Sequence, residues 1–294
     1  MPALDTDKVS LGGSAACLSV YAVLTALVVY NSNKCAYCDQ RLVVCNYLIA
    51  LCSFRLAIFA LRLAASTMQT WGPVPFWISY ELTPAATFCL AQAGAQLLFD
   101  WHWHGLTHAD IPRPQRLGWT VTRHLLLSLA LVLSMLNIVT RNYIPLGYVA
   151  AALWWACAAA LACGSVWIWL RRRSRVCIGR GVGVTGLGGV GSLGEVAGIG
   201  DESDRAQAGI GALLLSHLFA LALSAQAVFV LLLALGRFYH PQDAAASLPL
   251  REAGVVALNV VPDLLVLLPA VAVDMRDLDN LAAFRFGLRG TSAS

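Results

Sequence analysis

The sequence predicts an all-α membrane protein, a bundle of seven transmembrane helices with its N-terminus outside or lumenal and its C-terminus cytoplasmic. Its composition, 59% hydrophobic and 12% charged with a mean hydropathy of +0.69, lies outside the range of ordinary soluble domains. Seven apolar stretches each hold the roughly 20 residues that a helix needs to cross a bilayer. They lie at about 11–32, 41–65, 73–99, 122–140, 143–170, 208–236 and 250–273.

The stretch at 11–32 is expected to be a retained helix and not a cleaved signal peptide. Asp5 and Asp7 stand beside Lys8 before it, where a signal peptide has a positive region, and its apolar run is longer than such peptides carry. The other six stretches are separated by segments rich in polar residues, proline and glycine. The whole chain, 1–294, is therefore expected to form one membrane domain.

The distribution of basic residues predicts the orientation, because short loops rich in Lys and Arg stay in the cytoplasm. With the N-terminus outside, fourteen basic residues fall on the cytoplasmic side and four on the other, while Arg55 and Arg62 fall inside the second span. The net charge of +4 is thus explained by membrane topology, and nucleic acid is not an expected partner.

Residues 176–207 are expected to form a flexible, glycine-rich cytoplasmic loop. Gly186, Gly188 and Gly191 match the G-x-G-x-x-G spacing of dinucleotide sites, but that fingerprint requires a preceding strand and a following helix. We attribute the match to the abundance of glycine.

Ionisable residues inside spans are costly and usually face the bundle interior, where they pair or serve a function. Arg55, Glu81 and Asp263 fall at similar heights in three spans, so we expect an intramembrane polar cluster that also includes Asn46 and Asn259. Two interpretations of this cluster stay open. It is either an internal ion pair that stabilises the bundle, or a functional element, namely a ligand site, an ion site or a conformational switch. Other polar residues that could extend it are Gln92, Gln96, His217 and Gln226.

Pro84 and Pro262 interrupt the third and seventh spans close to the acidic residues. A proline inside a helix frees a carbonyl group and permits a bend. Both positions are candidate hinges.

Arg171, Arg172, Arg173 and Arg175 form a basic cluster at the inner end of the fifth span. It is a candidate contact for anionic lipid or cytosolic proteins, and it also serves as a positive-inside stop signal. No catalytic constellation, metal site or cofactor is expected, and the oligomeric state stays open.

Known seven-helix classes differ from this chain in specific residues. A retinal protein needs a lysine in its last helix, and the only lysines here are Lys8 and Lys34. A G-protein-coupled-type receptor agrees in helix number and orientation, but no arginine follows Asp100. It remains an alternative.

Three spans read together resemble the tobamovirus multiplication protein family, seven-helix proteins of plants and algae. The second span carries a similar Asn…Arg…Phe pattern, the third a similar Leu-Pro start with an aromatic-acidic inner end, and the last a similar proline followed by an apolar run. The matching positions are Asn46, Arg55, Phe59, Leu82, Pro84, Phe88, Leu97 to Trp101, Pro262 and Leu264 to Leu268. The chain departs from the pattern at Asn259, where the family has Glu, at Asp263, where it has Ser, and in the order of the acidic and aromatic residues at 99–101.

The resemblance implies a protein of an endomembrane, such as the vacuolar membrane, that binds cytosolic partners including small Arf-like GTPases. The plasma membrane is the second expected location. The function we expect is a non-enzymatic scaffold or receptor-like protein that recruits cytosolic proteins through its basic loops. The alternative is a transporter or channel that uses the Arg55, Glu81 and Asp263 cluster.

Overall fold

The computed structural model describes residues 11–35, 42–67, 73–102, 113–139, 144–181, 200–236 and 252–272, and every element among them is a helix. In chain order these are α1 (Leu11–Cys35), α2 (Leu42–Thr67), α3 (Pro73–His102), α4 (Arg113–Val139), α5 (Ile144–Gly181), α6 (Gly200–Gly236), α8 (Glu252–Val255), the π-helix η4 (Val256–Val260) and α9 (Val261–Ala272). The last three run on as one rod, so seven helices are long and apolar enough to span a membrane. The predicted all-α fold with seven membrane-spanning helices is confirmed, and the predicted orientation of the termini stays a prediction.

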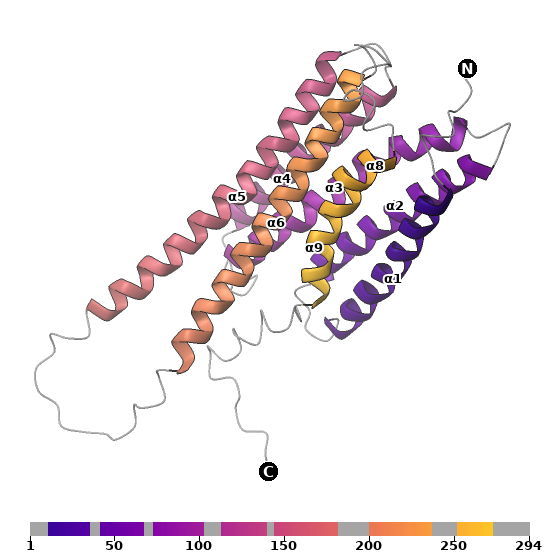
Figure 1. The fold of residues 1–294 in the computed structure, drawn as a ribbon. Coiled ribbons are helices and arrows are strands. Elements are labelled where there is room, and N and C mark those ends of the chain that lie inside the picture. Colours follow the sequence, from indigo (N-terminus) through magenta and orange to yellow (C-terminus); the bar gives the residue numbers. More distant parts are fainter. Residues whose placement is uncertain are drawn as a thin grey trace, which may run out of the picture.

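The helices pack around α3, which is the most buried of the seven spans (Figure 1). It contacts α2 on one side and α4, α5 and α6 on the other. The rod that ends in α9 lies against α6 and closes the bundle by contacting α1. A position on α3 can therefore reach most of the bundle, whereas α9 packs mainly against α6.

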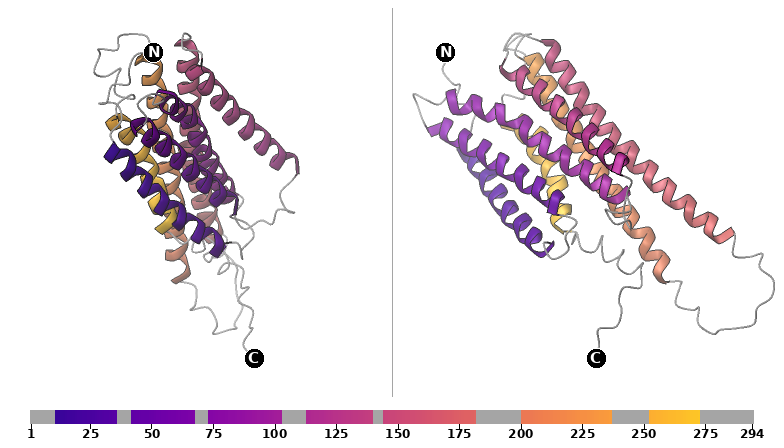
Figure 2. Two further views of the ribbon diagram at one scale, coloured as in Figure 1. Left: turned by 90° about the vertical axis from the view of Figure 1, so that its right-hand side faces the viewer. Right: turned by 180° about the vertical axis from the view of Figure 1, so that it is seen from behind.

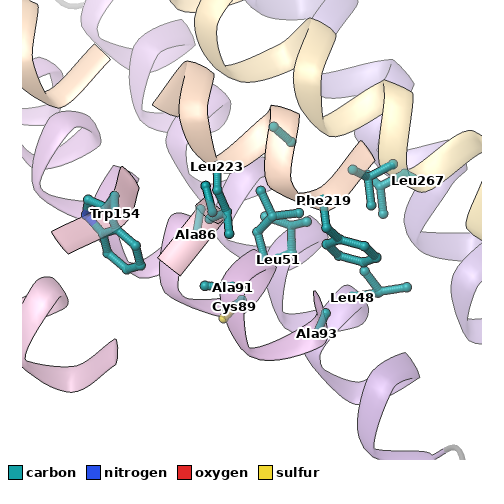
Figure 3. Close-up of a cluster of buried hydrophobic side chains, with 14 of the residues drawn as sticks. Leu48, Leu51, Ala86, Cys89, Ala91, Ala93, Trp154, Phe219, Leu223 and Leu267 are labelled. Carbon is teal, nitrogen blue, oxygen red and sulfur yellow. The ribbon is translucent and has the colours of Figure 1, made fainter. Parts of the chain in front are cut away.

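The outside of the bundle is apolar, as expected when hydrocarbon replaces water as the solvent. Large hydrophobic side chains are exposed along α4, for example Leu125, Leu129, Val132 and Leu136. The interior is also apolar between its polar clusters, and Figure 3 shows side chains of α2, α3, α6 and α9 meeting there, among them Leu51, Ala86, Phe219 and Leu267. The protein is therefore a multi-pass membrane protein.

Two glycines allow α3, α5 and α6 to approach closely. A Cβ atom at Gly94 would lie 3.0 Å from Leu161 and 3.1 Å from Phe219, and one at Gly164 would lie 2.9 Å from Leu98. Small residues commonly serve this purpose between membrane helices.

Helices α5 and α6 run side by side and pass beyond the other helices at one end of the bundle (Figures 1 and 2). Residues 176–181 and 200–207, which we expected in the flexible loop, belong to these helices, and residues 182–199 lie outside the described part. Another helix, α4, begins at Arg113, well before the apolar run that predicted it. Hydropathy locates the membrane-embedded part of a helix but not its polar extension, which explains both differences.

Candidate functional site

The buried carboxylate of Asp263 binds side chains from three other helices. Arg55 Nε of α2 donates to Asp263 Oδ2 at 2.5 Å, and Tyr21 Oη of α1 donates to the same oxygen at 2.9 Å. Gln226 Nε2 of α6 donates to Oδ1 at 2.7 Å. The second nitrogen of the guanidinium, Arg55 Nη2, lies 3.4 Å from Asn259 Oδ1 in η4. We call these five residues the Asp263 cluster.

The cluster lies deep in the bundle. Arg55 stands at the middle of α2, about 18 Å from the helix end at Thr67 at about 1.5 Å per residue. Arg55 is 1% exposed and Asp263 is 0% exposed. Removing one partner of such a buried pair commonly costs about 3–5 kcal/mol, because the other charge stays buried without compensation.

The backbone around Asp263 departs from a regular α-helix. Across η4 the N–H of Val261 donates to the carbonyl of Val256, five residues back, and Pro262 follows directly with no N–H to give. Single π turns of this kind are frequent at functional sites. Asn259 and Asp263 are four residues apart, so they lie on one face of the rod and both reach Arg55. The candidate hinge at Pro262 directly follows the π turn, a true irregularity of the helix.

Two atoms of the Asp263 cluster have no hydrogen-bond partner among the described residues. They are Asn259 Nδ2, a donor, and Gln226 Oε1, an acceptor. Buried polar atoms are nearly always paired, so a vacant donor and a vacant acceptor beside one carboxylate are unusual. They could hold a water molecule or a small polar ligand.

Glu81 and Asn46, which we expected in this cluster, lie elsewhere. Glu81 is exposed on the same face of α3 as Val74 and Ile78, while its neighbour Tyr80 points into the bundle. Asn46 is exposed as well, because it precedes Arg55 by nine residues, or two and a half turns, and so lies on the opposite side of α2. Similar height in the membrane was the basis of the prediction, and height does not fix the direction in which a side chain points.

Tyr21 belongs to the cluster and was missed. Its ring stacks on Phe59 at 5.7 Å between centroids, which directs the hydroxyl to Asp263. The available signal was its position at the middle of a span, away from the membrane interface where tyrosines gather.

Arg62 lies on the same face of α2 as Arg55, seven residues further along, and it is 1% exposed. Its guanidinium lies over two rings of α3, 5.5 Å from the centroid of Phe76 and 5.4 Å from that of Tyr80. Its Nε and Nη2 have no hydrogen-bond partner among the described residues. The sequence placed Arg62 inside the second span but gave it no role.

A second polar cluster joins α3 to α4. Gln96 Nε2 donates to Asp100 Oδ1 at 2.7 Å, and its oxygen accepts from Arg123 Nη1 at 2.5 Å. Arg123 Nη2 lies 3.2 Å from His124 Nε2, and His124 Nδ1 lies 3.1 Å from Gln92 Nε2. The guanidinium and the Gln92 amide nitrogen both donate, and a neutral imidazole has only one acceptor nitrogen, so the ring accepts a hydrogen bond from one of these two neighbours. Gln92 and Gln96, which we expected to extend the Asp263 cluster, bond to α4 instead.

The other predicted residues occupy separate places. Pro84 lies inside α3, which stays helical through it. His217 lies on an exposed face of α6, where its Nδ1 is 2.8 Å from the carbonyl oxygen of Leu213. In α5, Arg171 is exposed with its guanidinium 5.1 Å from the ring centroid of Trp167, and the side chains of Arg172, Arg173 and Arg175 lie outside the described part.

Fold and site together define a multi-pass membrane protein with a buried charged cluster. No family model, no curated protein and no solved structure matches the chain. The resemblance to the tobamovirus multiplication protein family therefore stays a prediction.

Proposed function

We propose that this protein is a receptor-like membrane protein without enzymatic activity, in which the Asp263 cluster controls how cytosolic proteins are recruited. The observation that carries this proposal is the convergence of Tyr21, Arg55 and Gln226, from three helices, on one carboxylate of a fourth. A change at Asp263 therefore affects the hydrogen bonds of α9 to all three helices at the same time.

The helix that bears Asp263 is suited to move. It packs mainly against α6, and it contains a π turn and Pro262 immediately before the carboxylate. Switching proteins use an element with two discrete arrangements that a local charge change biases. Here the charge pair of Arg55 and Asp263 supplies that change, and the rod that ends in α9 is the moving element.

The test compares the full-length protein in lipid nanodiscs with its Asp263→Asn variant. After incubation with cytosol, we expect the bound cytosolic proteins to differ between the two, because the neutral side chain no longer forms an ion pair with Arg55. Glu81→Gln removes the same charge from an exposed position of α3 and is the matched control. Identical sets of bound proteins for all three forms would contradict the proposal. A small Arf-like GTPase is the first candidate partner, on the ground of the family resemblance.

Transport is the second candidate function. It is favoured by the vacant Asn259 Nδ2 and Gln226 Oε1 beside Asp263, which suit a water molecule or a translocated polar solute. Proton flux measured in proteoliposomes, present in the wild type and lost in Asp263→Asn but not in Glu81→Gln, would establish it. Absence of flux in the wild type would leave recruitment as the function.

A further inference from the structure

We propose that Arg62 forms a second site, which binds an oxyanion, either a carboxylate or a phosphate group. The site consists of the Arg62 guanidinium on α2 and the rings of Phe76 and Tyr80 on α3. It does not depend on the role assigned above to the Asp263 cluster.

The charge of Arg62 needs a counter-charge. An arginine stays protonated in proteins, so it cannot become neutral to adapt to an apolar surrounding. Aromatic rings stabilise a buried cation only in part, and buried charges are otherwise paired. Among the described residues no ion pair is made by Arg62, although Arg55 two turns away has one.

The vacant atoms define the shape of the missing partner. Nε and Nη2 are the two donors on one edge of the guanidinium, and both lack a hydrogen-bond partner. Their two N–H groups run parallel and match the two oxygens of a carboxylate or phosphate group. Because Phe76 and Tyr80 lie over the guanidinium, this edge is the part left for recognition.

The site lies close to one end of the bundle. Arg62 is five residues from the end of α2, or about 8 Å along the axis, and Phe76 lies in the first turn of α3. The site is therefore near the membrane boundary where α2 ends and α3 begins, which the charge distribution predicts to be the outer one. A lipid headgroup and a dissolved anion both fit such a place.

The test measures the melting temperature of the full-length protein in neutral detergent with sodium phosphate, with sodium acetate, and with sodium chloride at matched ionic strength. A parallel arm uses nanodiscs of phosphatidylcholine alone or mixed with phosphatidic acid. We expect an oxyanion-dependent rise in the wild type that Arg62→Gln abolishes. The control Arg171→Gln removes a charge of the same kind from an exposed ring contact and should retain the rise.

Arg62→Lys tests whether the site needs the geometry of the guanidinium or only its positive charge. Lysine keeps the charge but lacks the two parallel N–H donors. We expect it to bind at least about tenfold more weakly than the wild type. It also keeps the proposal testable if Arg62→Gln does not fold.

The two arms distinguish the sources of the anion. A rise with phosphate or acetate identifies a dissolved oxyanion, and a rise only with phosphatidic acid identifies a lipid headgroup. If no probe stabilises the wild type more than the Arg62 variants, the proposal is wrong.

Discussion

Arg55 and Arg62 lie two turns apart on one face of α2 and are equally buried, but their surroundings differ completely. Arg55 meets a carboxylate that tyrosine and glutamine side chains also bind. Arg62 meets two aromatic rings and leaves two donors vacant. Burial alone thus does not define the role of a membrane arginine. Arg55 forms an ion pair that holds helices together. Arg62 has no counter-ion among the described residues, and under our proposal a bound oxyanion supplies it.

The largest expected effect tests the completed pair. Arg55→Ala leaves Asp263 without its cation, and we expect it to lower the free energy of unfolding by about 3–5 kcal/mol. A reduced melting temperature in detergent measures this loss. Asp263→Asn in the same chain should restore part of it, because no lone carboxylate remains. An unchanged melting temperature in Arg55→Ala would show that the pair does not hold the bundle.

Tyr21→Phe tests the second donor to Asp263 and keeps the ring that stacks on Phe59. Loss of one buried hydrogen bond to a charged group should cost about 1.5–3 kcal/mol. The same melting assay applies, with Tyr148→Phe, at an exposed position of α5, as the control. Equal melting temperatures for both variants would remove Tyr21 from the Asp263 cluster.

Arg62→Met should have the opposite sign. In a buffer without oxyanions, the apolar methionine removes the cost of an uncompensated buried charge. It also loses the contact of the cation with two rings, worth about 2 kcal/mol. We expect the free energy of unfolding to rise by about 1 kcal/mol on balance. The melting temperature should rise slightly. A fall as large as that of Arg55→Ala would mean that Arg62 is already paired, and the contrast between the two arginines would disappear.

The smallest effect is expected at the membrane edge. Arg171→Gln removes an exposed cation from the ring of Trp167 and should leave the melting temperature within experimental error. Exposed charges interact weakly because water and salt screen them. A clear loss of stability would show that the contact between Arg171 and Trp167 contributes to the stability of the fold.

The same comparison separates what the sequence could predict from what it could not. Seven spans were predictable because a helix is the only way to satisfy the backbone of a long apolar segment in hydrocarbon. A partner for Arg55 was predictable too, since a lone charge at mid-membrane is too costly. In the structure this partner is Asp263, and Glu81, the other predicted acid, lies elsewhere.

The choice of further partners was not predictable, because it depends on how each helix is rotated and on its neighbours. Glu81 lies at the membrane depth expected for the cluster, but on an exposed face of α3. Gln226 of α6, in contrast, points to Asp263. Tyr21 was missed because the spans were searched for charged and amide side chains and not for tyrosines. The π turn that contains Asn259 was not predictable either, because hydrophobic periodicity has no signal for it.

The length of α5 has a consequence for the geometry of recruitment. Its apolar part ends at Arg171 but the helix continues to Gly181, about 15 Å further, and α6 begins about 18 Å before its own apolar part at Ala212. This distance exceeds the Debye length of about 8 Å at physiological salt. Arg171, where the apolar part of α5 ends, lies within reach of the charge of the lipid surface, whereas the end of the helix at Gly181 lies beyond the Debye length. If the proposed recruitment uses the ends of α5 and α6, a bound protein lies where the electrostatic field of the bilayer is already screened.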